Sequence, residues 1–137
     1  MHQVTQELVI STKRIWTGRI ISALPVLLLA FSAIGKISQS AEVLQGMAHY
    51  GYAVQFTVPL GILELLVAVI YAIPRTSFFG AILVTGYLGG ATATNVRLGD
   101  PLFIVPVLVG ALAWVGLYLR DTRLHTVIFK VRRAAFE

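Results

Sequence analysis

The sequence contains no cysteine and has few charged residues. Only 12% of its 137 residues are charged, whereas 57% are hydrophobic, and the mean hydropathy is +0.81. Soluble domains average about 25% charged residues, so this chain has too few charges to cover the surface of a water-soluble fold. Disorder is also excluded, since disordered chains are poor in apolar residues. We therefore expect one small integral membrane domain in contact with the lipid bilayer.

The missing residue types also exclude several kinds of site. Without cysteine, the chain itself cannot form a disulfide, an iron–sulfur cluster or a thiolate zinc site. Three histidines and six acidic residues are too few for a dense metal site, and we expect no bound metal. The net charge of +5 is explained by basic residues at the ends of apolar segments, and no nucleic-acid-binding module fits in the rest of the chain.

Four apolar segments predict four membrane-spanning helices. Each is close to the roughly 20 residues that cross about 30 Å of hydrocarbon. Helices are favoured because the segments are continuously apolar rather than alternating, and only helices and closed barrels satisfy the backbone in lipid. We therefore expect an all-α, four-helix membrane bundle. The segments are residues 20–34, 56–73, 78–96 and 102–119.

The connections between these segments carry turn residues. Pro74–Ser77 and Leu98–Pro101 predict tight turns, with Pro101 suited to the start of a helix. The first connection is longer, and within it Ser40 is a plausible helix start and Gly51 a plausible helix stop. A short interfacial helix is therefore expected in the first outer loop.

The positions of the basic residues predict the orientation. All Lys and Arg residues except Lys36 and Arg97 fall on the side of the two termini. Basic residues collect on the cytoplasmic side of a membrane, so both termini are expected to be cytoplasmic. The alternative, a signal peptide cleaved near Ser40, would leave three spans.

The chain is thus divided into three parts. Residues 1–18 form a cytoplasmic N-terminal segment, residues 19–119 the four-helix domain, and residues 120–137 a basic cytoplasmic tail. In the tail, apolar residues recur at helical spacing on one face, and basic residues lie on another face. The tail either lies on an anionic leaflet or only enforces the topology.

Glu64 is the clear ionisable residue within an apolar segment. An ionised group in that position costs several kcal/mol unless it faces the interior of the bundle. At helical spacing its face carries small or polar residues, among them Thr57 and Gly61. We therefore expect Glu64 to point into the bundle, about 12 Å below the outer end of its helix.

Polar residues at the outer ends of the neighbouring segments predict a pocket around Glu64. A nearby Lys36 or Arg97 would keep the carboxylate ionised. The cluster is either a proton or ligand-binding site, or a structural ion pair that locks the helix order. The candidate residues are Ser32, Lys36, Glu64, Thr92, Asn95 and Arg97.

Small residues on the second and third segments predict close helix packing. The candidate packing residues are Gly61, Gly86, Gly89 and Gly90. The alternative is that the missing side chains leave room for a flat ligand beside Glu64. The aromatic residues Tyr87 and Trp114 are expected to serve packing.

In order and spacing, these motifs resemble the DoxX-like family of small four-helix membrane proteins, over about Arg19 to Arg123. The resemblance implies a four-helix bundle in the bacterial inner membrane, with some members tied to quinone-linked oxidoreductases. Where members often carry histidine, this chain has Asn95, which cannot carry a proton. The motifs are Gly35-Lys36, Gly51-Tyr52, Leu60–Leu65, Pro74–Thr76, Gly80-Ala81, Gly86–Ala91, Thr94–Arg97 and Leu119–Asp121.

Three functions remain open. The first, favoured by the resemblance, is a redox-associated subunit without a catalytic set or covalent cofactor of its own. It would bind a quinone or similar small apolar ligand around Glu64 and work with a redox partner subunit. The second is a proton-coupled small-molecule transporter acting as a homodimer. The third is an assembly or scaffold module that contacts another membrane protein through the small residues of the third segment.

Overall fold

The structure, a computed structural model, describes residues 11–136, and within this range it contains helices and no strands. The all-helical prediction is confirmed. Of the N-terminal segment 1–18, residues 1–10 lie outside the described residues. The elements are α1 (Thr12–Ile37), α2 (Ala41–His49), the 3-10 turn η1 (Val54–Phe56), α3 (Thr57–Ala72), α4 (Ser77–Arg97), the 3-10 turn η2 (Pro101–Phe103), α5 (Ile104–Arg120) and α6 (Thr122–Ala134).

The long helices have the apolar character of membrane-spanning segments. Within residues 11–136, three helical stretches are long and apolar enough to cross a membrane: Thr12–Ile37, Val54–Ala72 and Pro101–Arg120. Many of their large apolar side chains are exposed, and Phe31 of α1 is 82% exposed. The membrane location is therefore supported. Helix α4 is 21 residues long but rich in glycine and threonine, and its crossing remains a prediction.

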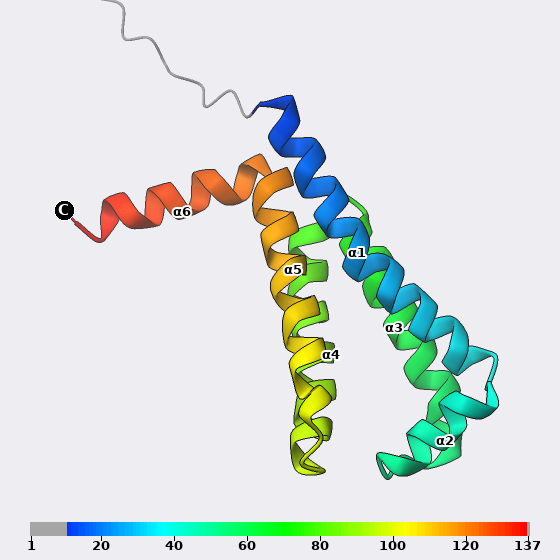
Figure 1. Cartoon of the computed structure of the whole chain (residues 1–137). Coiled ribbons are helices and arrows are strands. Elements are labelled where there is room, and N and C mark those ends of the chain that lie inside the picture. Colours follow the sequence, from blue (N-terminus) through cyan, green and yellow to red (C-terminus); the bar gives the residue numbers. More distant parts are fainter. Residues whose placement is uncertain (1–10, 137) are drawn as a thin grey trace, which may run out of the picture.

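The four long helices form a ring in which α1 and α4 each pack between α3 and α5. Figure 1 shows the start of α1 and the end of α5 at the same end of the bundle, where α6 turns away sideways. We call this the terminal end. At the other end, α2 and the start of α3 lie apart from the α4–α5 connection (Figure 1). We call this the open end.

A buried tyrosine joins the helices near the terminal end. The Tyr71 hydroxyl on α3 hydrogen-bonds the carbonyl oxygen of Ala113 at 2.6 Å and the hydroxyl of Ser22 at 3.1 Å. Arg120 donates to the Tyr71 carbonyl oxygen at 2.8 Å. Gly80 lets α4 approach the same residue, because a Cβ there would lie 2.3 Å from the Tyr71 Cα.

The connections follow the turn residues. Ser40 is the N-cap of α2, and Gly51 adopts a positive φ of 80° after that helix, a conformation that favours glycine. Asp100 accepts a hydrogen bond from the Leu102 N–H and Pro101 opens η2. The short helix predicted in the first connection is confirmed as α2, while its place at a membrane interface remains a prediction.

Candidate ligand-binding site

A buried ion pair joins α1 and α3 toward the open end. The Lys36 ammonium lies 2.7 Å from the Glu64 carboxylate, which is only 3% exposed. Lys36 also donates to the Ser32 hydroxyl at 2.6 Å, and Ser32 donates to Glu64 at 3.2 Å. Ser32 and Lys36 lie one turn apart on α1, so both face α3. The structure thus brings together three of the six candidate residues.

Gly61 sets the distance between the two helices that carry this pair. A Cβ at Gly61 would lie 2.8 Å from the Lys36 Cβ and 3.0 Å from the Ala33 carbonyl oxygen. Any larger residue would push α1 and α3 apart. Gly61 therefore serves the close packing of α1 and α3. Because Gly61 lies about one turn before Glu64 on α3, this close approach brings the aliphatic part of Lys36 beside Glu64.

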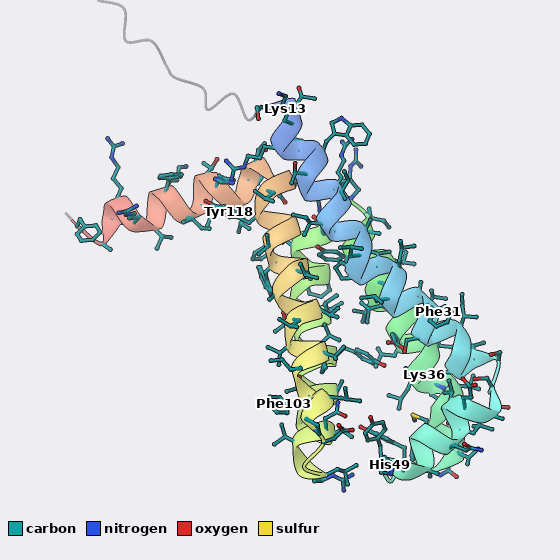
Figure 2. The ribbon with its side chains drawn as sticks, in the orientation of Figure 1. Lys13, Phe31, Lys36, His49, Phe103 and Tyr118 are labelled. Carbon is teal, nitrogen blue, oxygen red and sulfur yellow. The ribbon has the colours of Figure 1, made fainter. Side chains whose placement is uncertain are left out.

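A cavity of about 350 Å³ lies beside the ion pair, between α4 and the helices α1, α2 and α3. Figure 2 shows Lys36 and His49 on one side of the open end and Phe103 on the other. Most of the lining is aromatic, small or apolar, with the ammonium of Lys36 among it. The lining residues are Lys36, Met47, Tyr50, Tyr52, Leu60, Gly86, Tyr87, Gly90, Ala91, Thr94 and Asn95.

Three of the four glycines of α4, those toward the open end, face open space rather than a neighbouring helix. A Cβ at Gly86, Gly89 or Gly90 would meet no atom of the described residues within 4 Å. Gly86 and Gly90 line the cavity, whereas Gly89 lines a separate groove between α4 and α5. Within one copy of the chain these three glycines therefore do not serve the packing role that the sequence suggested, unlike Gly61.

Asn95 lies at the cavity with one polar atom unused. The residue is 9% exposed, and its Nδ2 donates to the Ala91 carbonyl oxygen at 3.0 Å. Because that carbonyl can only accept, the amide nitrogen must face it, and Oδ1 is left as the free atom. This oxygen is buried and has no hydrogen-bond partner in the described part of the chain.

The remaining two candidates lead elsewhere. Arg97 donates to the Tyr50 carbonyl oxygen at 2.6 Å and so ties the end of α4 to the loop after α2. Thr92 donates to the Leu88 carbonyl oxygen at 2.8 Å and lines the α4–α5 groove. These contacts take both side chains to partners other than Glu64. Thr92 belongs to the helical face that looks toward α5, which its position alone did not reveal.

Residues 20–116 match the DoxX-like family, and the matched residues make up more than half of the chain. The chain belongs to the DoxX-like family. No curated protein and no solved structure gave a match. The DoxX-like region includes the whole cavity lining and ends in the last turn of α5, so α6 lies beyond it.

Three tyrosines of this DoxX-like chain belong to the site, a role that the sequence patterns did not predict. Tyr87, half-buried on α4, lines the cavity. The Tyr52 and Thr94 hydroxyls are 2.9 Å apart and join the loop before α3 to α4. Their spacing relative to Glu64 depends on how far α3 and α4 diverge, which no local sequence pattern encodes.

Tyr50 closes the loop side of the DoxX-like cavity. Its hydroxyl donates to the Asp100 carboxylate at 3.4 Å. Burial raises the pKa of Tyr50, and the negative charge of Asp100 and this hydrogen bond raise it further. Tyr50 therefore holds its proton, and the loop after α2 stays attached to the α4–α5 connection.

The chemistry of the cavity suits a small, flat organic molecule rather than a metal. Mostly apolar walls with a few placed polar groups are typical of small-molecule sites. The polar groups here are the Lys36 ammonium, phenolic hydroxyls and the Asn95 acceptor. Among residues 11–136, no three His, Asp or Glu side chains come together as a metal-binding group.

Proposed function

We propose that this DoxX-like protein crosses the bacterial inner membrane four times, with both termini cytoplasmic, and binds a flat, mostly apolar molecule at the open end. The molecule carries a ring hydroxyl, as in the reduced form of a quinone. The chain has no cysteine and no metal-binding group among its described residues, so the electrons of the ligand would be exchanged with a partner subunit. The protein would thus be a ligand-binding component rather than the catalyst.

The observation that carries this proposal is the free oxygen of Asn95. A buried acceptor without a partner costs about 1–3 kcal/mol, and a hydroxyl donated by a ligand would remove that cost. A quinone carbonyl could not do so, because it offers no proton. The site therefore favours the hydroxyl-bearing form, with Asn95 as the acceptor.

The shape of the cavity and its charged edge support the same ligand. Gly86 and Gly90 leave a wall without side chains, against which a flat ring can lie. Tyr87 and Lys36 also line the cavity and add a phenolic hydroxyl and a basic side chain beside that wall.

Two neighbouring glycines give the test. We expect Gly90→Leu to fill the cavity, whereas Gly89→Leu places the same side chain in the α4–α5 groove. A short-chain hydroquinone should raise the Tm of the detergent-solubilised wild type and Gly89→Leu, and it should leave Gly90→Leu unchanged. Asn95→Leu should weaken hydroquinone binding about tenfold, the equivalent of about 1.4 kcal/mol.

The proposal fails if the hydroquinone stabilises none of these proteins, or if it stabilises Gly90→Leu as much as the wild type. Equal binding of the hydroquinone and its quinone by the wild type would remove the role given to Asn95. Without ligand, both leucine variants should be at least as stable as the wild type, because neither glycine has a described neighbour within 4 Å and leucine favours a helix over glycine.

The α4–α5 groove favours a second candidate, the assembly module. It has a volume of about 540 Å³, and its walls include the small residues Gly89, Ala93, Gly110 and Ala111. Small residues let a further helix approach closely in a membrane. Here Gly89→Leu should abolish association with a second copy or a partner and Gly90→Leu should not. The transporter hypothesis also requires a homodimer.

A further inference from the structure

A second, smaller cavity lies at the terminal end, and arginines dominate its lining. Its volume is about 160 Å³, and it is bounded by the α3–α4 turn and the α5–α6 junction. Three guanidinium groups and a single carboxylate face it, which gives an excess of positive charge. The lining residues are Arg19, Pro74, Ser77, Arg120, Asp121, Thr122 and Arg123.

The most buried of these arginines is held in place and has a free donor. Arg120 lies over the Tyr71 ring, 4.8 Å from its centroid, and one terminal nitrogen donates to the Tyr71 carbonyl oxygen. Its Nε is buried and has no partner anywhere in residues 11–136. Guanidinium groups carry N–H donors in a fixed fork that matches phosphate oxygens. Arg120 is thus positioned for an anion that the chain itself does not supply.

The single carboxylate in the cavity offsets only part of this positive charge. Asp121 accepts a hydrogen bond from the Arg123 backbone N–H and caps α6. The Arg123 Nε is 4.0 Å from Asp121, and the Arg123 side chain is 73% exposed. Arg123 and Arg19 can therefore both turn toward a ligand while Asp121 stays at the helix end.

The start of α4 adds backbone N–H donors beside the same cavity. Ser77, the first residue of α4, is buried and lines the cavity, and its hydroxyl already donates to the Pro74 carbonyl oxygen at 3.0 Å. Within the described chain, the N-cap residue Thr76 makes no side-chain bond to the helix, since its hydroxyl donates to the Ile70 carbonyl oxygen. The uncapped N–H groups of a 21-residue helix favour negative charge at this position.

The surroundings place this cavity at the level of the lipid headgroups. Helix α6 leaves the bundle sideways at this end (Figure 1) and exposes apolar residues such as Val127 and Val131 beside basic ones. Such a helix lies in the plane of an anionic membrane surface. Trp16 is 56% exposed near the start of α1, and Arg19 lies over its ring. Tryptophan in that setting is typical of the membrane interface.

We propose that this arginine-lined cavity binds the phosphate group of an anionic phospholipid of the leaflet on which α6 lies. Arg120 and the start of α4 form the inner wall, and Arg19 and Arg123 close over the phosphate from the outside. This arginine-lined cavity lies at the opposite end of the bundle from the cavity beside Glu64, for which we propose a ring-shaped ligand. The two proposals do not depend on each other.

Native mass spectrometry of the full chain in mild detergent tests this. We expect phosphatidylglycerol to remain bound at lipid concentrations at which phosphatidylcholine is no longer bound. Arg19→Gln combined with Arg123→Gln should weaken phosphatidylglycerol binding at least tenfold. The matched control, Arg132→Gln combined with Arg133→Gln, removes the same charge from the far part of α6 and should change it less than twofold.

Other outcomes overturn the proposal. Equal losses in the two double variants would mean that general surface charge, not the cavity, holds the lipid. Full displacement of phosphatidylglycerol by millimolar inorganic phosphate would assign the cavity to a soluble phosphate instead. Gly90→Leu should leave lipid binding unchanged, so that failure of the ring-binding proposal and failure of this one remain distinguishable.

Discussion

The terminal end and the open end of the bundle differ in how closely the helices approach. At the terminal end, a Cβ on Gly18, Gly80 or Gly116 would lie 2.7, 2.3 or 2.4 Å from an atom of a neighbouring helix. On α4 toward the open end, a Cβ on Gly86 or Gly90 would meet nothing in the described chain within 4 Å. On α4 the same residue type therefore makes a tight contact at the terminal end and leaves a cavity toward the open end, where Gly61 still packs α3 closely against α1.

The polar groups differ between the ends in the same way. At the terminal end, neutral groups such as the Tyr71 and Ser22 hydroxyls are paired and fully enclosed. Toward the open end, a charged pair and an unpaired amide oxygen border a cavity. The difference teaches that the core around Tyr71 serves packing, whereas the core beside Glu64 leaves space that a ligand can occupy. Side-chain contacts such as that between Tyr52 and Thr94 join the helices around that space.

The largest expected effect on the free energy of unfolding comes from adding one methyl group at the terminal end. Gly80→Ala places a Cβ against the backbone of Tyr71, which cannot move as a side-chain tip can, and should lower the free energy of unfolding by about 3 kcal/mol. Gly86→Ala, on the same helix, should raise it by about 0.5–1 kcal/mol, because alanine favours a helix over glycine. Equilibrium unfolding in mixed micelles measures both.

Opposite signs for these two substitutions would establish the difference between the ends. Equal losses would mean that α4 is packed along its whole length and that the cavity is closed in solution. This pair also marks the limit of sequence analysis. Both glycines lie in the same apolar segment, and only the divergence of α3 and α4 distinguishes them.

The next effect in size comes from the ion pair. Glu64→Gln leaves the Lys36 ammonium without its anion. Breaking a fully buried pair costs about 3–5 kcal/mol. Because the Lys36 side chain is 15% exposed and lies near the end of α1, we expect a smaller loss of unfolding free energy, about 2 kcal/mol.

The double variant Glu64→Gln with Lys36→Met is the control, and it should recover most of that loss because no unpaired charge remains. A double variant as unstable as Glu64→Gln alone would show that the site contributes through its packing rather than its charge. The two ends of the bundle would then be held by the same kind of contact.

The smallest effect concerns the loop that closes the open end. Since the pKa of Tyr50 is raised by burial and by Asp100, the folded protein keeps this proton to higher pH than the unfolded chain does. The stability from this contact is therefore present below about pH 10 and is lost as the pH rises through the folded-state pKa.

The phenolate absorbance of the wild type minus that of Tyr50→Phe gives the titration of Tyr50. Asp100→Asn should move this titration toward lower pH, and Asn can still cap η2. If Tyr50 titrates at its ordinary pKa in the wild type, the contact with Asp100 is not kept in solution.

Hydropathy and turn residues predicted the helical fold, the turn at Pro74 and the short helix after Ser40. They succeed because the bilayer imposes one length and one polarity on every span. The contact of Ser32, Lys36 and Glu64 was also accessible, since Ser32 and Lys36 share one helical face and Glu64 is costly unless it is turned inward.

The rest of the site depends on distances between helices, which local patterns do not contain. Asn95 was singled out, but its free atom proved to be the acceptor because the Ala91 carbonyl takes its N–H. Arg97 and Thr92 lie on α4 with Asn95, yet their contacts direct them to Tyr50 and to the groove beside α5. Helical phase places a residue on a face, and only the neighbouring helices decide what that face meets.

The hydrogen bonds of Tyr71 have a consequence for biosynthesis. Its hydroxyl reaches Ala113, which is 42 positions further along the chain, and its carbonyl oxygen reaches Arg120, 49 positions further. While the ribosome is still producing α4, neither partner exists, so a nascent α3 enters the bilayer with this phenol lacking its closest acceptor. The terminal end of the bundle can therefore form only after α5 has been synthesised and inserted.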